Sequence, residues 1–221
     1  TRDGVRFALT MSLTPPLAAM LRDPLLQQRF DDHLGRLEAL TEHEVKRLEG
    51  DGYFQPVALF YRAHFAEVRR VWESIGHDVV GALARWSDTG AVDLITCSAT
   101  HAYLPGLLPC PEALRAQLRL GKAAFSHLVG REAVGMWLPE CAYDPAFDAE
   151  IQRAGIRYTL LDTHGVERAM PRPPFGVHQP IFSRSGTAFF ARDSASSRQV
   201  WSREIGYPGN DLYREFYRDI G

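Results

Sequence analysis

The chain has 221 residues, of which 45% are hydrophobic and 24% charged, and its formal net charge is -2. This size and composition are ordinary for one globular domain with a single core. The near-neutral charge and the scattered arginines argue against a nucleic-acid-binding protein or a membrane-surface protein, and no apolar run is long enough to cross a bilayer.

The first part of the chain predicts one strand followed by long helices. Residues 5–13 are apolar and partly β-branched, which predicts a buried opening strand. Asp23 and Pro24 form an N-cap and first-turn pair for a helix that runs to about residue 48. A second helical pattern covers residues 57–86, with a break at Gly76.

From Gly90 onward, strand patterns alternate with helix patterns. Strands are expected at residues 91–100, 135–138, 156–162 and 187–193, and helices at residues 111–128 and 145–154. Residues 170–185 are rich in Pro and Gly, which predicts a long surface loop with the character of a lid. We therefore predict one α/β domain over residues 1–221, with parallel strands and helical crossovers.

Polar and aromatic side chains follow the predicted strands at their carboxyl ends. In parallel α/β folds these ends meet at one edge, where reacting groups gather. We expect six such residues to face a single opening: His101, Glu140, Asp162, His164, Arg192 and Trp201. Aromatic faces such as those of Tyr143 and Trp201, beside carboxylates and imidazoles, suit a sugar ring better than a phosphate, and the chain has no P-loop or GxGxxG motif.

Several strings carry a resemblance to a known family. They are VDLITCSATHAY, WLPECAY, AGIRYTLLDTHGV and QVWSREIGYPGNDLYREFYRDIG. Over essentially its whole length the chain resembles glycoside hydrolase family 57, in particular its 1,4-α-glucan branching enzymes. The resemblance implies a distorted (β/α)7 barrel and retaining chemistry on α-1,4-glucans in glycogen biosynthesis, without metal or organic cofactor. It also implies that Glu140 is the catalytic nucleophile, that His101 is the histidine of the SATH string, and that Trp201 is an active-site aromatic.

Three departures from the family pattern matter. The family's opening strand, with its histidine motif, would precede residue 1. Its acid/base Asp lies in a PYDAELFGHWW-like string that this sequence lacks, so the barrel is expected to be incomplete at both ends and the chain alone to be inactive. In the lid, the branching enzymes carry a tyrosine where this chain has Phe175, which keeps an aromatic ring for substrate contact but loses the hydroxyl.

Each candidate residue also has a structural interpretation. Glu140 could be a solvated strand-end acid, and His101 could bond a neighbouring carbonyl. Asp162 and His164 could hold each other and their loop, and Arg192 could pair with Asp193 instead of a carboxylate in the site. Asp144 is interpreted as a helix N-cap, and Trp137 as part of the barrel wall in preference to a platform for a sugar ring.

Four alternatives remain for the function. Within the family, the chain could belong to a 4-α-glucanotransferase or an α-amylase; outside it, it could be a non-catalytic glucan-binding remnant or a metal-dependent polysaccharide deacetylase. Cys97, His101, Cys141 and His164 have no closed zinc-site spacing, so no metal is expected. Three cysteines (Cys97, Cys110 and Cys141) are too few for a disulfide framework, which favours a cytoplasmic location.

Overall fold

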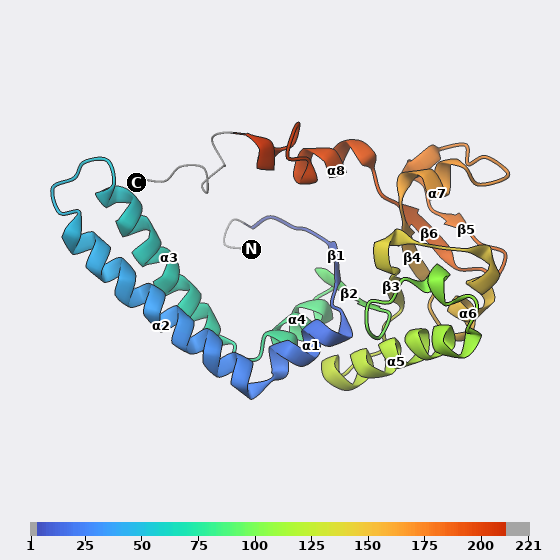
Figure 1. The fold of residues 1–221 in the computed structure, drawn as a ribbon, viewed down its shortest axis with the longest axis horizontal. Helices are drawn as coiled ribbons and strands as arrows, with labels where there is room; N and C mark the ends of the chain where they lie inside the picture. The colour runs from blue at the N-terminus through green and yellow to red at the C-terminus, as the bar shows by residue number, and fades with distance from the viewer. Residues whose placement is uncertain (1–3, 211–221) are drawn as a thin grey trace. The chain divides into compact units, whose positions relative to one another are not determined.

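The structure is a computed structural model that describes residues 4–210, and it divides into two compact units (Figure 1). The helical unit comprises the chain up to residue 94 together with residues 123–132. The sheet unit comprises residues 95–122 and the chain from residue 133 onward. The boundary passes through one strand and one long helix, and the assignment of the whole chain to one catalytic domain stays a prediction.

The helical unit contains four α-helices and the first strand. Their bounds are β1 (Leu9–Ser12), α1 (Pro15–Arg22), α2 (Pro24–Arg47), α3 (Gln55–Ser74) and α4 (Val79–Asp88). The predicted N-cap is confirmed, because the Asp23 carboxylate accepts a hydrogen bond from the Leu26 N–H at 3.0 Å. The predicted break is also confirmed, since Gly76 has a φ of 64° between α3 and α4. No helix within residues 4–210 combines the length and the apolar character that crossing a membrane requires.

Helices α2 and α3 lie side by side, as Figure 1 shows, and ion pairs join them. Arg69 of α3 contacts Asp31 of α2 and lies 3.0 Å from the Glu38 carboxylate. Strand β1 differs from the prediction of a buried strand over residues 5–13, because only four residues are extended and three of these are exposed. The prediction was wrong because apolar composition indicates a strand but not its neighbours: β1 stands at one end of the strand order, so within the described residues it pairs on one side only.

Five further strands complete the six-stranded sheet of the described residues. Their bounds are β2 (Val92–Cys97), β3 (Gly135–Trp137), β4 (Tyr158–Leu161), β5 (Ile181–Phe182) and β6 (Ala188–Ala191). The strand order is β1-β2-β3-β4-β6-β5. The pairs β2–β3, β3–β4 and β4–β6 are parallel, whereas β5 runs antiparallel to β6.

Helices connect the parallel strands. Their bounds are α5 (Pro111–Val129), α6 (Asp148–Arg153), α7 (Thr163–Glu167) and α8 (Ser194–Trp201), with 3-10 turns η1 (Leu104–Leu107), η2 (Pro139–Cys141), η3 (Pro145–Phe147), η4 (Gly176–His178) and η5 (Tyr207–Gly209). Because α5 joins β2 to β3 and α6 joins β3 to β4, and both strand pairs are parallel, the predicted α/β class with helical crossovers is confirmed; α8 follows β6, the last strand of the described residues. The segment 170–185, predicted as a loop, contains the short elements η4 and β5, which its Pro-rich composition did not indicate.

The core of the sheet unit lies between the strands and the crossover helices. It includes Leu114 and Leu118 of α5, Met136 of β3 and Phe189 of β6, all at most 3% exposed. Helix α5 reaches β2 most closely at Gly121, where a Cβ atom would stand 2.4 Å from the Cys97 carbonyl oxygen. The Thr96 hydroxyl donates to the Gly121 carbonyl at 3.2 Å. This contact fixes the carboxyl end of β2, which leads into the candidate site.

Candidate active site

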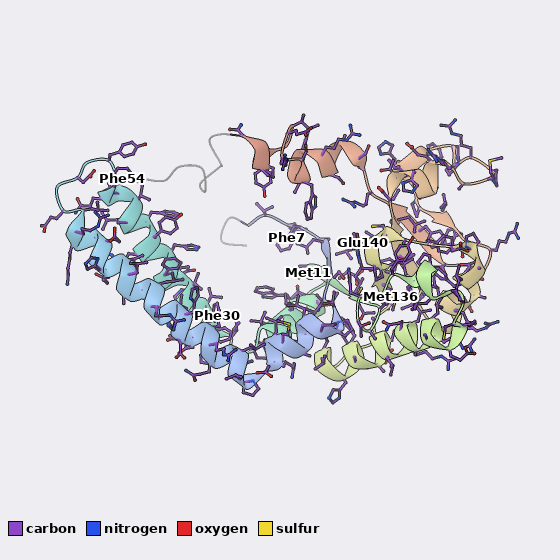
Figure 2. The ribbon with its side chains drawn as sticks, in the orientation of Figure 1. Phe7, Met11, Phe30, Phe54, Met136 and Glu140 are labelled. Carbon is purple, nitrogen blue, oxygen red and sulfur yellow. The ribbon has the colours of Figure 1, made fainter. Side chains whose placement is uncertain are left out.

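Glu140 stands directly beyond the carboxyl end of β3, within the turn η2 (Figure 2). Its φ is 59° and that of Cys141 is 52°, so both residues occupy the left-handed region, which costs a non-glycine residue about 1–2 kcal/mol. The turn is closed by the Cys141 N–H, which donates to the Leu138 carbonyl at 2.9 Å. The Glu140 side chain is 76% exposed, so the strand end presents its carboxylate to solvent instead of burying it.

His101 follows the neighbouring strand β2 in the same way. Parallel pairing sets Cys97 opposite Trp137, so the two strands end at the same edge of the sheet. His101 also has a left-handed backbone, with a φ of 58°. Its Nε2 atom lies 3.8 Å from Glu140 Oε1. Three of the four non-glycine residues with positive φ in the described chain therefore gather at this one edge, which is the type of position at which backbone strain accompanies function.

Two hollows meet at Glu140 and Cys141. The first has a volume of 850 Å³ and lies between the end of β3 and helix α8. Its lining residues are Trp137, Glu140, Cys141, Arg192, Ser196, Ser197, Val200 and Trp201. Since two indole rings line it beside a carboxylate and a guanidinium, this hollow combines apolar faces with polar groups.

The second hollow has a volume of 420 Å³ and lies by the start of α7. Its polar and aromatic lining residues are Tyr103, Glu140, Tyr143, Asp144, Asp162 and His164. The six residues predicted to share one opening are thus arranged differently: Arg192 and Trp201 line the first hollow, Asp162 and His164 line the second, Glu140 lines both, and His101 lies beside Glu140.

Asp162 and His164 lie close to each other, as one interpretation of the sequence expected. One Asp162 carboxylate oxygen accepts the Thr163 N–H at 2.8 Å and so caps α7, and the other lies 3.5 Å from His164 Nδ1. Asp144 is a helix N-cap as predicted, because it accepts the Ala146 N–H at 2.8 Å. A substrate role for Asp162 and His164 stays a prediction.

Tyr143 packs inside the second hollow against two aromatic rings. Its ring centroid lies 4.7 Å from that of Phe189 and 5.6 Å from that of Phe147. Burial, and after it the nearby Asp148 carboxylate, raise the pKa of the Tyr143 phenol above its ordinary value.

Trp201, Arg192 and Phe175 occupy different surroundings. Trp201 was expected at a strand end, but it is the last residue of helix α8, where its ring is 78% exposed. The strand prediction was wrong because Asp193 caps a helix there, accepting the Ser196 N–H at 2.9 Å. Arg192 follows β6, and its N–H donates to the Leu161 carbonyl. Phe175 is 63% exposed and lines neither hollow.

Sequence reasoning missed part of the first hollow. Trp137 was assigned to the barrel wall, yet it is half-buried and lines the hollow. Ser196, Ser197 and Val200 of α8 were not considered, because the helix itself was not predicted. The signal was present in the sequence, since Asp193 followed by a run of small polar residues is typical of a helix start.

The cysteines near the site have the character of buried thiols. Burial raises the pKa of both Cys97 and Cys141, and all three cysteines are free. Across residues 4–210, no group of three or more His, Cys, Asp or Glu side chains is placed to hold a metal ion.

The chain is similar in sequence to a known enzyme family and to its members. The model of the family described as glycosyl hydrolase family 57 matches residues 20–220. A relative from Thermococcus kodakarensis, the 1,4-alpha-glucan branching enzyme TK1436, is 32% identical over 98% of this chain and 35% of its own length.

Two solved structures are also similar. The alpha-amylase AmyC from Thermotoga maritima has a TM-score of 0.92 and 38% identity, covering 99% of this chain and 42% of its own. The GH57-type branching enzyme from Pyrococcus horikoshii has a TM-score of 0.86 and 32% identity, covering 100% of this chain and 43% of its own. These similarities confirm the predicted likeness and place the sheet and its crossovers within the (β/α)7 fold of such enzymes. The chain spans well under half the length of each relative.

Proposed function

Since this chain belongs to glycosyl hydrolase family 57, we propose that it carries the nucleophile of a retaining 1,4-α-glucan branching enzyme. The observation that carries the proposal is the position of Glu140: an exposed carboxylate on a left-handed turn, at the junction of two hollows. A carboxylate at the carboxyl end of a parallel strand, with open space on both sides, can reach a glycosidic bond of a bound chain. The similarity to branching enzymes indicates the reaction type.

In the proposed reaction, the Glu140 carboxylate attacks the anomeric carbon of an α-1,4-linked glucan, and the bond from that carbon to the O4 oxygen breaks. A second carboxyl group protonates the leaving oxygen. The same group then accepts the proton of an acceptor 6-hydroxyl, which displaces Glu140 and forms the α-1,6 branch. Asp144 and Asp162 line the second hollow but are engaged as helix caps, so we assign the acid/base role to neither.

The two hollows suit the proposed substrate, an α-1,4-glucan of the amylose or glycogen type. Trp137 and Trp201 offer apolar ring faces in the first hollow, and His101, Tyr143 and Arg192 offer polar groups around Glu140. Sugar rings bind such mixtures, stacking their C–H faces and bonding through their hydroxyls. We further propose glycogen biosynthesis as the process and the cytoplasm as the location, which the three free cysteines support.

We also propose that the segment 170–185 acts as a lid that keeps water from the glycosyl-enzyme, so that transfer exceeds hydrolysis. One end of this segment is fastened, because the Ser185 N–H donates to the buried Asp148 carboxylate at 2.9 Å. Its middle carries exposed Phe175, an aromatic ring suited to close over a sugar.

The test is a transfer assay on amylose with the Glu140→Gln variant of a complete enzyme that contains this chain, because the chain alone is expected to be inactive. New α-1,6 bonds, counted after enzymatic debranching, should fall by about a thousandfold or more, because the nucleophile is lost. Glu112→Gln is a matched control: Glu112 is 77% exposed, and within residues 4–210 its carboxylate pairs with Arg115 at the surface. Undiminished branching by Glu140→Gln would refute the assignment. Glucan binding by the complete wild-type enzyme without any turnover would favour a glucan-binding role instead.

α-Amylase activity is the second candidate, because the Thermotoga maritima neighbour carries that description and shares 38% identity with this chain. The same assay separates the two reactions. A branching enzyme creates α-1,6 bonds with few new reducing ends, whereas an amylase creates reducing ends without branches. Hydrolysis by the complete wild-type enzyme that exceeds transfer would therefore replace the first proposal by the second.

A further inference from the structure

Cys97 and His101 are in direct contact at the end of β2. The Cys97 sulfur lies 3.1 Å from His101 Nδ1, and Cys97 itself is fully buried. On the other side of the same imidazole ring, Nε2 lies 3.8 Å from Glu140 Oε1. The three side chains thus form a row that runs from the protein interior to the exposed carboxylate.

The direction of the sulfur–nitrogen contact follows from the chemistry of the two groups. Burial raises the pKa of the Cys97 thiol, so the sulfur keeps its proton. A thiol is a weak donor and a poor acceptor, whereas the unprotonated nitrogen of a neutral imidazole is a good acceptor. The favoured contact is therefore an S–H that donates to Nδ1, which leaves Nδ1 without a proton.

The carboxylate at the other end of the row favours the same state. A neutral imidazole carries one proton, and a nitrogen that faces a carboxylate is stabilised when it is the protonated one. Both neighbours thus favour a proton on Nε2. We propose that Cys97 is a positioning residue, which holds neutral His101 in the tautomer that presents its Nε2–H to Glu140 and to a substrate oxygen beside it.

The backbone around His101 is held well enough for such control. Gln117 of α5 fastens the preceding turn: its carbonyl accepts the Ala99 N–H at 3.0 Å, and its side chain accepts the Thr100 N–H at 3.0 Å and donates to the Thr100 hydroxyl at 2.9 Å. The left-handed φ of His101 is thereby imposed by the turn, and the ring orientation is left to the thiol. The substrate part of the proposal rests on the proposed function; the tautomer does not.

The experiment is nuclear magnetic resonance of the 15N-labelled chain at about pH 8, where imidazoles are neutral. Long-range proton–nitrogen spectra distinguish a protonated ring nitrogen from an unprotonated one, and the His101→Gln variant identifies the His101 signals among the eight histidines. The wild-type chain should show an unprotonated Nδ1 and a protonated Nε2. Cys97→Ala should shift both signals toward the average of the two tautomers, and Cys97→Ser, which keeps a donor, should restore the wild-type pattern.

Cys110→Ala is the matched control, because Cys110 is exposed and should leave His101 unchanged. The other seven histidines report whether each variant is folded. A wild-type spectrum with the proton on Nδ1 would overturn the proposal, and so would a folded Cys97→Ala variant with the wild-type pattern. A Glu140→Gln variant that still transfers would refute the proposed function and leave the tautomer result standing.

Discussion

Substituting Gly121 by alanine should destabilise the chain, although the same change in an ordinary helix position would stabilise it. A Cβ atom at Gly121 would lie 2.4 Å from the Cys97 oxygen, 3.1 Å from the Ala99 nitrogen and 3.3 Å from the Ser98 carbonyl carbon. All three are backbone atoms, which cannot rotate away. Restoring ordinary contact requires the middle of α5 to move from the end of β2 by about 1 Å, since carbon and oxygen atoms pack no closer than roughly 3.5 Å.

The magnitude follows from two opposing effects. Overpacking of this kind costs about 1–3 kcal/mol. The better helix propensity of alanine offsets about 1 kcal/mol of that cost. We therefore expect the free energy of unfolding to fall by about 0–2 kcal/mol, with a melting temperature lower by roughly 2–4 °C for each kcal/mol.

Gly35→Ala is the matched control, because Gly35 lies in the middle of α2 and its added Cβ would meet only the Arg69 side chain, at 3.9 Å. This variant should gain up to about 1 kcal/mol. Urea denaturation followed by circular dichroism measures both changes. If Gly121→Ala proves as stabilising as Gly35→Ala, the close approach of α5 to β2 does not exist in solution, and the placement of Cys97 and His101 that depends on it is wrong.

Two further predictions concern titrating groups. Iodoacetamide should modify the exposed Cys110 in the native chain, but Cys97 and Cys141 only after unfolding. Burial raises the pKa of the Cys97 and Cys141 thiols, so that little of the reactive thiolate is present. Peptide mass spectrometry measures the modification of each cysteine, and equal rates at Cys110 and Cys141 in the native chain would contradict the prediction. The carboxyl group of Asp193, which caps α8, should titrate with a midpoint below 3.8. Hydrogen bonds from the Ser196 hydroxyl and N–H lower its pKa from that ordinary value. With the folded pKa depressed, the cap's contribution to stability is complete above pH 3.8 and is lost as the pH falls through the folded pKa. The amide chemical shift of Ser196, followed by nuclear magnetic resonance against pH, measures this titration, and the Asp193→Asn variant should abolish the change in shift. A midpoint at or above 3.8 would refute the prediction.

Helix starts were predictable wherever a local signal specified them. The pair Asp23 and Pro24 opens α2, Pro111 opens α5, and Asp144 with Pro145 opens η3 at the positions expected from sequence. Each signal works through atoms within four residues, so no knowledge of the fold is needed. Helix α8 carried the same kind of signal in Asp193, which was outweighed by the apolar pattern of the residues around Val200.

What depends on distant neighbours was less predictable. The apolar composition of residues 5–13 indicated a strand, but its exposure depends on what pairs with it and covers it. Likewise, Ile181 and Phe182 become β5 only because they meet Ala188 and Phe189 of β6 in antiparallel register. The strand ends that hold the candidate site were predictable because parallel strands must end at a common edge, but the division of that edge into two hollows depends on α8.

The left-handed turns at His101, Glu140 and Cys141 could not be predicted from sequence, because Glu and Cys rarely adopt that conformation, and His, although enriched in it, adopts it in only a small fraction of cases. At about 1–2 kcal/mol each, the three together cost several kcal/mol, a large share of the net stability of a domain. Such a cost persists only where the surroundings impose it, and here Gln117 holds one turn and the Leu138 carbonyl closes the other. The strain therefore argues for a carboxylate and an imidazole fixed in place before a substrate arrives, which is what a nucleophile needs and a merely solvated strand-end acid does not.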